Sequence, residues 1–320
     1  MSVDIATARG VVRVVDHVDL ALRPGCTLGV VGESGSGKSM LLRAILGLHP
    51  DNVEVSGSVQ YRGQELVGAP IGLRRQLWAN EMAVVFQDPM TSLNPVQRIG
   101  NQVEEPLVVH TTMNRRERRR RVDELLEQLG IVDPPRCRRS YPHQLSGGMR
   151  QRIAIAIALI RDPSVVLADE PTTALDVTVQ AQILELLARQ RRSSELAMVI
   201  VSHDLGVIAD IADDVAVMYA GQLVEHGSAH TLLERPRMRY TAALLASRPS
   251  LTGDRGRRLD TIAGRPPSPS ETSSGCRFAP RCRHGDEACE AVPALTVLPG
   301  DEHHRVRCWH PISTTGAENE

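Results

Sequence analysis

Aromatic side chains are the scarcest class in this 320-residue chain. Two Trp, four Tyr and two Phe amount to 2% of the residues, whereas hydrophobic residues of all kinds make up 42%. We therefore expect a globular core that is built mainly from Val, Leu, Ile, Ala and Met. The length suits one large domain with a small one, or two modest domains.

Long apolar runs, a secretion signal and a strong net charge are missing as well. The longest apolar run, residues 153–160, is far shorter than the roughly 20 residues of a membrane-spanning helix. The N-terminus lacks the basic, apolar and small-residue blocks of a secretion signal. A formal net charge of −1 gives no general attraction to nucleic acid or anionic lipid. We expect a protein of the cytoplasm without a nucleic-acid partner, which reaches a membrane only through partner proteins.

A glycine-rich segment stands between a strand-like run at residues 27–31 and a helix-like run at residues 40–48. Small residues let such a loop curl around a phosphate with its N–H groups inward, and the following helix adds its positive end. Lys38 would reach the β- and γ-phosphates of a nucleotide, and the Ser39 hydroxyl would bind Mg²⁺. An ordinary glycine-rich turn is the alternative, which the lysine, the serine and the flanking runs disfavour. The predicted nucleotide-binding residues are Gly32, Glu33, Ser34, Gly35, Ser36, Gly37, Lys38 and Ser39.

A short apolar run at residues 164–168 ends in two carboxylates, Asp169 and Glu170. A buried strand would deliver Asp169 to its carboxyl end, where the carboxylate can serve Mg²⁺ directly or through water. Glu170, one residue further, can orient or deprotonate a water molecule aimed at the γ-phosphate. Taken alone the pair is typical of a plain strand end, but together with the phosphate loop it favours a catalytic role.

The order of the segments predicts an α/β fold. Residues 1 to about 88 look like strands and turns, and residues from about 89 to 153 are helical and polar. From 154 to about 235, helices alternate with apolar strands, which we expect at residues 165–168, 197–201 and 215–219. Such a pattern indicates a mostly parallel sheet with a helical insertion.

Composition divides the chain into four predicted parts. A linker rich in Pro and Ser at residues 264–274 precedes a short segment with four cysteines. The predicted parts are a nucleotide-binding domain at 1–235 with a helical subdomain at about 89–153, a helix-like tail and linker at 236–274, a four-cysteine domain at 275–311, and a flexible tail at 312–320.

Several motifs occur together in an order typical of one family. Residues 145–152, Leu-Ser-Gly-Gly-Met-Arg-Gln-Arg, resemble the signature motif of the ATP-binding cassette (ABC) family. The family's other motifs resemble the phosphate loop, Gln87, the Asp169-Glu170 pair, Ala174-Leu175-Asp176 and His203, so the resemblance covers nearly all of residues 10–235. It implies a P-loop NTPase (RecA-like) core with a mostly parallel sheet, a helical subdomain and an antiparallel β N-terminal part.

Finer features are similar to one branch, the oligopeptide and dipeptide importer ATPases. These features are residues 86–95, Met149 in the signature, residues 168–180 and the four-cysteine tail. The resemblance implies an ATP-hydrolysing subunit that powers peptide uptake at the cytoplasmic face of the cell membrane. Its expected partners are two transmembrane permease subunits, a second ABC ATPase subunit that is identical or paralogous, and an extracytoplasmic substrate-binding protein. The alternatives are an importer ATPase for nickel or another small solute, and a soluble ABC ATPase, whose chains typically carry two cassettes or a long coiled coil.

The resemblance also assigns roles at a dimer contact. Ser146, Gly147 and Gly148 precede a helix-like run, so their N–H groups form an anion site. In the family this site binds the γ-phosphate of ATP held by the other subunit, which implies a dimer with ATP between two chains. Asp176 is expected to shape the same contact.

Further roles concern hydrolysis. Mg²⁺ is expected on Ser39, Asp169 and Gln87, and Gln87 also reaches the attacking water or senses the membrane subunit. His203 is expected to contact the γ-phosphate and to hold Glu170 and the water in place, whereas a lone His at a strand end is usually structural.

One departure from the family concerns the adenine ring. Family members usually stack adenine on an aromatic residue upstream of the phosphate loop, but the first aromatic residue here is Tyr61. The position that corresponds is near Ile5. Either residues further upstream supply the aromatic ring, or adenine packs on aliphatic and Arg side chains.

The four cysteines of the tail, Cys276, Cys282, Cys289 and Cys308, are spaced C-x5-C-x6-C-x18-C. Cysteines in the cytoplasm stay reduced, so a metal is favoured over disulfides. Zinc usually takes C-x2–4-C pairs, which the tail lacks, whereas a [4Fe–4S] cluster accepts four thiolates from wider loops. We therefore predict a structural [4Fe–4S] cluster, which the resemblance to the peptide-importer tail also implies. Zinc remains the alternative, with ligands also available from His284, His303, His304 and His310.

Overall fold

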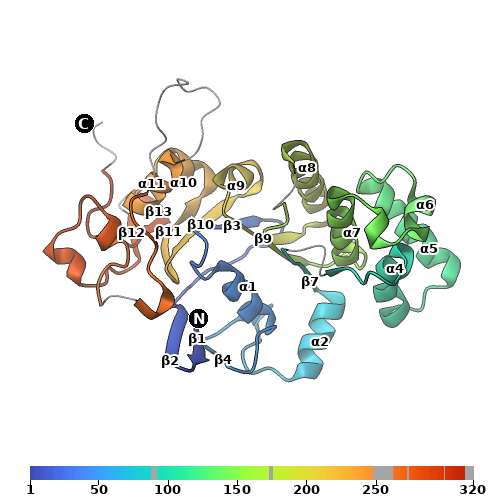
Figure 1. Cartoon of the computed structure of the whole chain (residues 1–320), viewed down its shortest axis with the longest axis horizontal. Helices are drawn as coiled ribbons and strands as arrows, with labels where there is room; N and C mark the ends of the chain where they lie inside the picture. Colours follow the sequence, from blue (N-terminus) through green and yellow to red (C-terminus); the bar gives the residue numbers. More distant parts are fainter. Residues whose placement is uncertain (88–91, 173–175, 248–261, 272–273, 299, 314–320) are drawn as a thin grey trace. The chain divides into compact units, whose positions relative to one another are not determined.

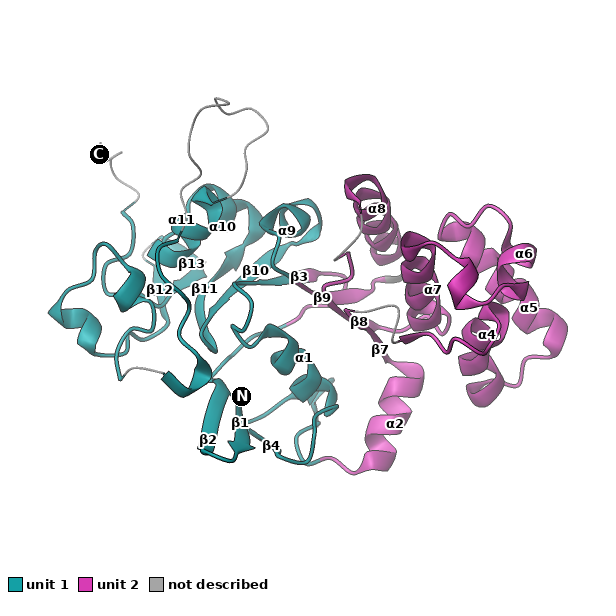
Figure 2. Ribbon diagram, viewed as in Figure 1, with its two compact units in different colours: residues 1–21, 28–68, 202–320 teal, residues 22–27, 69–201 magenta. Residues whose placement is uncertain are grey.

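The computed structural model describes residues 1–87, 92–172, 176–247, 262–271, 274–298 and 300–313, apart from the side chains of residues 193 and 194. The chain forms two compact units, which Figure 2 distinguishes by colour. Unit 1 comprises residues 1–21, 28–68 and 202–320, and unit 2 comprises residues 22–27 and 69–201. Parts of two sequence motifs, residues 88–91 and 173–175, lie outside the described residues.

The N-terminal strands of unit 1 form a small antiparallel sheet in the order β2-β1-β4 (Figure 1). These strands are β1 (Ser2–Thr7), β2 (Gly10–Val15) and β4 (Val53–Ser56). Val3 pairs with Val15 on one side and Val55 on the other, and it is fully buried. The predicted antiparallel N-terminal part is therefore confirmed. A two-stranded ribbon follows, made of β5 (Gln60–Tyr61) and β6 (Gln64–Glu65).

The larger sheet of unit 1 carries the phosphate loop. Its strands follow the order β12-β13-β11-β10-β3, and β3 runs parallel to β10. All five residues of β3 are buried, as expected for a continuous apolar run covered on both faces. These strands are β3 (Thr27–Val31), β10 (Asp214–Tyr219), β11 (Gln222–Ser228), β12 (Thr296–Leu298) and β13 (Asp301–Val306). The strands predicted at 27–31 and 215–219 are confirmed.

The α-helices of unit 1 include one that begins directly at the phosphate loop. They are α1 (Lys38–Leu46), α9 (Leu205–Ile211), α10 (Ala229–Glu234) and α11 (Arg239–Ala246). The helix α1 buries Leu41 and Leu42 and ends at Gly47, whose φ of 67° suits a left-handed C-cap.

Unit 2 combines parallel strands with a group of helices. The strands β7 (Met82–Val85), β8 (Val165–Asp169) and β9 (Ala197–Ser202) run parallel in the order β9-β8-β7. All six residues of β9 are buried. The strands predicted at 165–168 and 197–201 are confirmed as β8 and β9.

Between β7 and β8 the described residues are mostly helical, as predicted for the insertion. The helix α4 packs on α5, α6 and α7, and Val103, Val122 and Ile153 are fully buried. The helices that the described residues of unit 2 form are α2 (Ile71–Asn80), α4 (Ile99–His110), α5 (Arg115–Gln128), α6 (Pro134–Arg139), the 3₁₀ turn η1 (Pro142–Gln144), α7 (Gly147–Leu159) and α8 (Val177–Ser194). None of the described helices is both long and apolar enough to cross a lipid bilayer.

The segment with the four cysteines extends the sheet of unit 1. Its hairpin β12–β13 pairs through Val306 and Arg305 with β11. His304 Nε2 lies 2.7 Å from Glu225 Oε1 of β11, and both side chains are buried. The other elements of the segment and its linker are the 3₁₀ turns η2 (Pro269–Glu271), η3 (Ala279–Arg281) and η4 (Glu287–Glu290).

Candidate active site

The phosphate loop lies between β3 and α1, and its lysine is held by the loop itself. Lys38 is the first residue of α1 and is 5% exposed. Its ammonium group donates hydrogen bonds to the carbonyl oxygens of Gly32 and Glu33, at 2.7 and 2.9 Å, and lies 3.4 Å from Ser36 Oγ. The loop thus curls around the Lys38 ammonium group. It also lies beside the N-terminus of a helix, a position that favours an anion.

Two glycines make this curl possible. Gly32 and Gly37 have φ values of 150° and 97°. A Cβ atom at Gly32 would lie 2.1 Å from the Met218 carbonyl oxygen, and one at Gly37 would lie 2.5 Å from the Val14 carbonyl oxygen. Only glycine fits at either position, because backbone atoms cannot move aside as a flexible side chain can.

Unit 2 brings Gln87 and Glu170 together. Gln87 follows β7 and donates a hydrogen bond from Nε2 to Glu170 Oε2 at 3.1 Å. Asp169 ends β8 and is 5% exposed. The next residue, Glu170, has a left-handed φ of 48°, and its N–H donates to the Val201 carbonyl at 3.0 Å. This backbone leaves the strand geometry directly after Asp169, so the two carboxylates do not follow strand alternation.

The signature residues lie at the start of α7. Ser146 is the N-cap, and its Oγ accepts a hydrogen bond from Met149 N at 3.3 Å. Ser146 and Gly147 are exposed and Gly148 is half-buried. A Cβ atom at Gly148 would lie 2.8 Å from Val179 Cγ1, so the start of α7 packs closely on α8. The N-terminus of α7 is therefore exposed, and its role as an anion site stays a prediction.

Two further candidate residues follow or precede regular elements. Asp176 is the N-cap of α8, and its Oδ1 accepts from Val179 N at 3.0 Å. His203 follows β9 and is exposed, and the adjacent Asp204 caps α9. The capping bond explains a local role for Asp176, and its part in a dimer contact stays a prediction. Ile5, at the expected adenine position, lies half-buried in β1.

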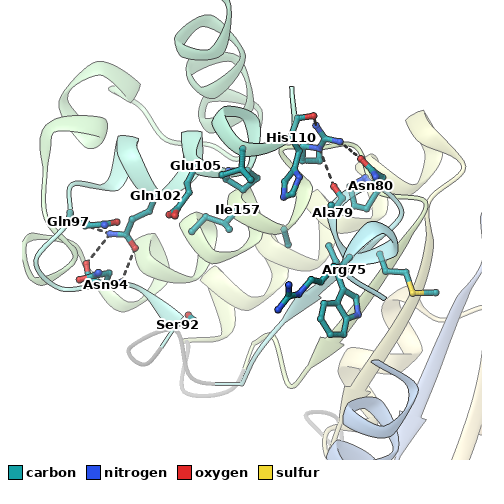
Figure 3. Close-up of a pocket in the computed structure, with 18 residues that line it drawn as sticks. Arg75, Ala79, Asn80, Ser92, Asn94, Gln97, Gln102, Glu105, His110 and Ile157 are labelled. Carbon is teal, nitrogen blue, oxygen red and sulfur yellow. Dashed lines mark hydrogen bonds between the residues drawn. The ribbon is translucent and has the colours of Figure 1, made fainter. Parts of the chain in front are cut away.

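A pocket of about 730 Å³ lies in unit 2 (Figure 3). Arg161 fixes one wall by hydrogen bonds to the carbonyl oxygens of Ala79 and His110, at 3.2 and 2.9 Å, and to the Asn80 side chain. Gln102 fixes another wall by three bonds of 2.8–3.0 Å to backbone atoms of Asn94 and Gln97. Apolar lining comes from Trp78, Pro106, Val109 and Ile157. Among the described residues that line this pocket, none is a predicted nucleotide-binding residue.

Comparison with known proteins decides the family. Residues 15–173 match the ABC transporter family, and residues 224–289 match the C-terminal region of oligopeptide/dipeptide transporters. A protein of Brucella abortus named as a peptide import ATP-binding protein is 46% identical over 306 residues, which cover 95% of this chain and 92% of that protein. A similarly named protein of Brucella ovis is 47% identical over 322 residues, covering 96% and 94%. The chain belongs to the ABC transporter family.

Solved structures support the same family. The dimeric structure of a bacterial ABC transporter cassette is similar with a TM-score of 0.65 and 27% identity, over 71% of this chain and 96% of that one. A dimeric post-hydrolysis state of a cassette bound to ADP and Pi gives a TM-score of 0.64, also at 27% identity, over 71% and 98%. The ABC cassette therefore has the P-loop NTPase fold and is an ATPase.

Sequence reasoning missed an aromatic cluster beside the phosphate loop of this ABC ATPase. Tyr219, Tyr240 and Phe278 have ring centroids 4.6–5.3 Å apart. The Tyr240 hydroxyl accepts a hydrogen bond from Glu33 N at 2.9 Å, and burial raises the pKa of Tyr240. The only hint that the sequence offers is that aromatic residues are few, and three of them gather in this cluster.

The Cys276 thiol of the ABC ATPase lies near the other three tail cysteines. Cys276 N donates to the Cys289 carbonyl at 2.9 Å. Burial raises the pKa of Cys276, and the nearby Cys289 and Cys282 add to this rise. Burial likewise raises the pKa of Cys308, with contributions from Cys276 and Cys282. The four predicted ligands therefore gather in one region.

Another set of donors in this region also involves Cys289. Ligand atoms of Asp286, Cys289 and His310 lie within 4.8 Å of one another, and His310 Nε2 is 2.9 Å from Asp286 Oδ1. This set mixes sulfur, nitrogen and oxygen donors, a combination that suits zinc.

Proposed function

We propose that this chain is the ATP-hydrolysing subunit of an importer that carries peptides across the cytoplasmic membrane. One observation carries the cargo class: residues 224–289 match the C-terminal region of oligopeptide/dipeptide transporters. The names of the Brucella relatives support the same class. The ATPase acts at the cytoplasmic face, in a complex with two transmembrane permease subunits and an extracytoplasmic substrate-binding protein.

The working unit is a dimer of ATPase subunits, identical or paralogous. The chain holds one phosphate loop and one signature, and the signature residues Ser146 and Gly147 are exposed at a helix start. Such a start offers N–H groups and the positive helix end to an anion, here the γ-phosphate of ATP bound by the other subunit. The dimeric form of the similar cassettes supports this arrangement. Asp176 belongs to the same dimer contact.

Glu170 is the base for the attacking water. The hydrogen bond from Gln87 holds the Glu170 carboxylate in orientation, and a positioned carboxylate can take a proton from a water molecule. Gln87 and His203 complete the group, Gln87 by orienting Glu170 and the water, and His203 by contacting the γ-phosphate. Lys38 and the loop N–H groups stabilise the charge that develops on the phosphoryl oxygens.

The donor set fits Mg²⁺. Ser39, Asp169 and Gln87 offer a hydroxyl, a carboxylate and a carboxamide oxygen, and this hard cation prefers oxygen ligands. When bound, Mg²⁺ neutralises charge on the β- and γ-phosphates. The chain's own residues hold the nucleotide and orient the water.

The pocket of unit 2 receives a helix of a permease subunit. The hydrogen bonds of Arg161 and Gln102 hold the pocket walls in place, and its lining is partly apolar. Both features suit an amphipathic helix from a partner. Ser92, which follows Gln87 by five positions in the sequence, also lines this pocket.

The tail holds a [4Fe–4S] cluster on Cys276, Cys282, Cys289 and Cys308, as a structural clip. Four thiols in one region support this donor set. A tetrahedral zinc site would bring its ligand sulfurs to about 4 Å from one another. Among the described residues, the close donor group found is Asp286, Cys289 and His310 instead. Zinc on that group is the alternative.

Co-purification tests the transport role. Tagged protein extracted from membranes should bring two permease subunits and an ATPase partner with it. Trp78→Glu in the pocket should release the permeases while ATP binding is kept, because the charge opposes burial of an apolar partner. Val132→Glu, at a fully exposed site outside the pocket, is the control. A chain that co-purifies only with soluble proteins would contradict the transport role.

A further inference from the structure

Glu33, the second residue of the phosphate loop, is a junction between the loop and the C-terminal part of the chain. Its N–H donates to the Tyr240 hydroxyl at 2.9 Å, and its carbonyl oxygen accepts from Lys38 Nζ at 2.9 Å. Its carboxylate accepts two hydrogen bonds from the Arg281 guanidinium, at 2.6 and 3.0 Å. One residue therefore connects the phosphate-binding cation to α11 and to η3.

The Arg281 side chain is built into this position. It is 5% exposed, whereas the Glu33 side chain is 24% exposed. Its Nε donates to the Ala263 carbonyl at 2.9 Å, and its Nη1 lies 3.2 Å from the Tyr219 hydroxyl. A two-bond contact between guanidinium and carboxylate fixes geometry as well as charge, so Arg281 restrains Glu33 in both respects.

A second contact holds the same segment beside the loop. Arg277 Nη2 lies 2.6 Å from Asp16 Oδ2, and Arg277 also bonds the Ala220 carbonyl. The next residue, Gly221, donates from its N–H to the Ser36 carbonyl at 3.0 Å. The four-cysteine segment is thus anchored on both sides of the phosphate loop.

We propose that Arg281 positions the phosphate loop and offsets the charge of Glu33, so that ATP affinity depends on the four-cysteine segment. An unpaired carboxylate on the loop would oppose the anionic phosphates of ATP. Arg281 cancels that charge and at the same time fixes the residue whose carbonyl holds Lys38. This inference concerns ATP binding alone and does not depend on the transported cargo.

Titration of the full chain with ATP tests the role of Arg281. Arg281→Gln should weaken ATP binding by about tenfold, the scale typical of coupling between two sites. The loss should shrink at high salt, because screening weakens the repulsion by an exposed Glu33. Arg283→Gln, two residues away and exposed, should bind ATP like the wild type. Thermal unfolding without nucleotide identifies variants that are folded at the titration temperature.

The double variant Glu33→Gln/Arg281→Gln shows whether Arg281 acts by offsetting the Glu33 charge or only by supporting the phosphate loop. It removes both charges, so it should recover at least half of the ATP affinity that Arg281→Gln loses, measured on a logarithmic scale. If Arg281→Gln does not fold, Arg281→Lys replaces it, because lysine keeps the charge without the two-bond geometry. On a logarithmic scale, its loss of ATP affinity should be less than half of the tenfold loss expected for Arg281→Gln. ATP affinity within about twofold of wild type in the folded variants, or a salt-independent loss that the double variant does not reduce, would overturn the proposal.

Discussion

Glu170 and Lys38 have different parts in the proposed ATPase reaction. The left-handed backbone of Glu170 and the hydrogen bond from Gln87 hold the Glu170 carboxylate in place. Neither of these two features involves Lys38. Lys38 is bonded to loop carbonyls that shape the phosphate site. Removing either side chain should therefore affect different steps.

The first prediction separates turnover from binding. Glu170→Gln should keep ATP binding, lower turnover by about 10²–10⁴-fold through loss of a general base, and trap an ATP-bound dimer. Lys38→Ala should instead weaken binding itself. ATP hydrolysis by the assembled transporter and gel filtration with ATP measure the two effects, with Glu127→Gln on the exposed side of α5 as the control. Hydrolysis by Glu170→Gln at the wild-type rate would show that another group is the base.

At the residue scale, local spacing predicts the chemistry but not the long-range contacts. The loop from Gly32 to Ser39 and the pair Asp169-Glu170 are short, contiguous patterns, so sequence alone identifies them. The contact between Glu33 and Arg281 joins residues 248 positions apart. Nothing in the spacing of either residue indicates the other, because the contact exists only after the chain has folded.

Among the elements, buried strands were the easiest to predict. The strands β3 and β9 are apolar along their whole length because they are buried on both faces. The strand β13, Asp-Glu-His-His-Arg-Val, is mostly polar and pairs with β11 nearly 80 residues earlier. Its sequence therefore lacks a strand pattern, and only the cysteines of this region predict a distinct segment.

The hairpin β12–β13 depends on a buried pair. His304→Leu should lower the free energy of unfolding by about 3 kcal/mol, because Glu225 would remain buried without its side-chain partner. Denaturant titration measures the change. His303→Leu, at the exposed neighbouring position, should have little effect. Equal stability of the two variants would show that the pair does not anchor the hairpin.

The tail cysteines allow a direct metal test. Protein purified without oxygen should be brown and hold about four iron and four sulfide per chain. Cys282→Ser should bleach it, whereas Cys26→Ser, outside the tail, should not. One zinc with no iron would instead favour the group of Asp286, Cys289 and His310. Either metal result leaves the ATPase assignment unchanged.

At the scale of the whole molecule, the chain supplies energy and needs partners for transport. None of its described helices can cross a bilayer, and its net charge of −1 gives little attraction to lipid. Permease subunits are the proposed partners for transport, and the pocket of unit 2 is their proposed contact. In the proposed dimer, the ATP at each phosphate loop also contacts the signature residues of the other ATPase subunit.

Peptide uptake into proteoliposomes tests the account most directly. The complete transporter, with its substrate-binding protein and ATP on the cytoplasmic side, should accumulate a labelled peptide. The same complex carrying Glu170→Gln should bind ATP and transport almost none. ATP-dependent accumulation of nickel without peptide, or full peptide uptake by the Glu170→Gln complex, would contradict a peptide importer driven by this ATPase.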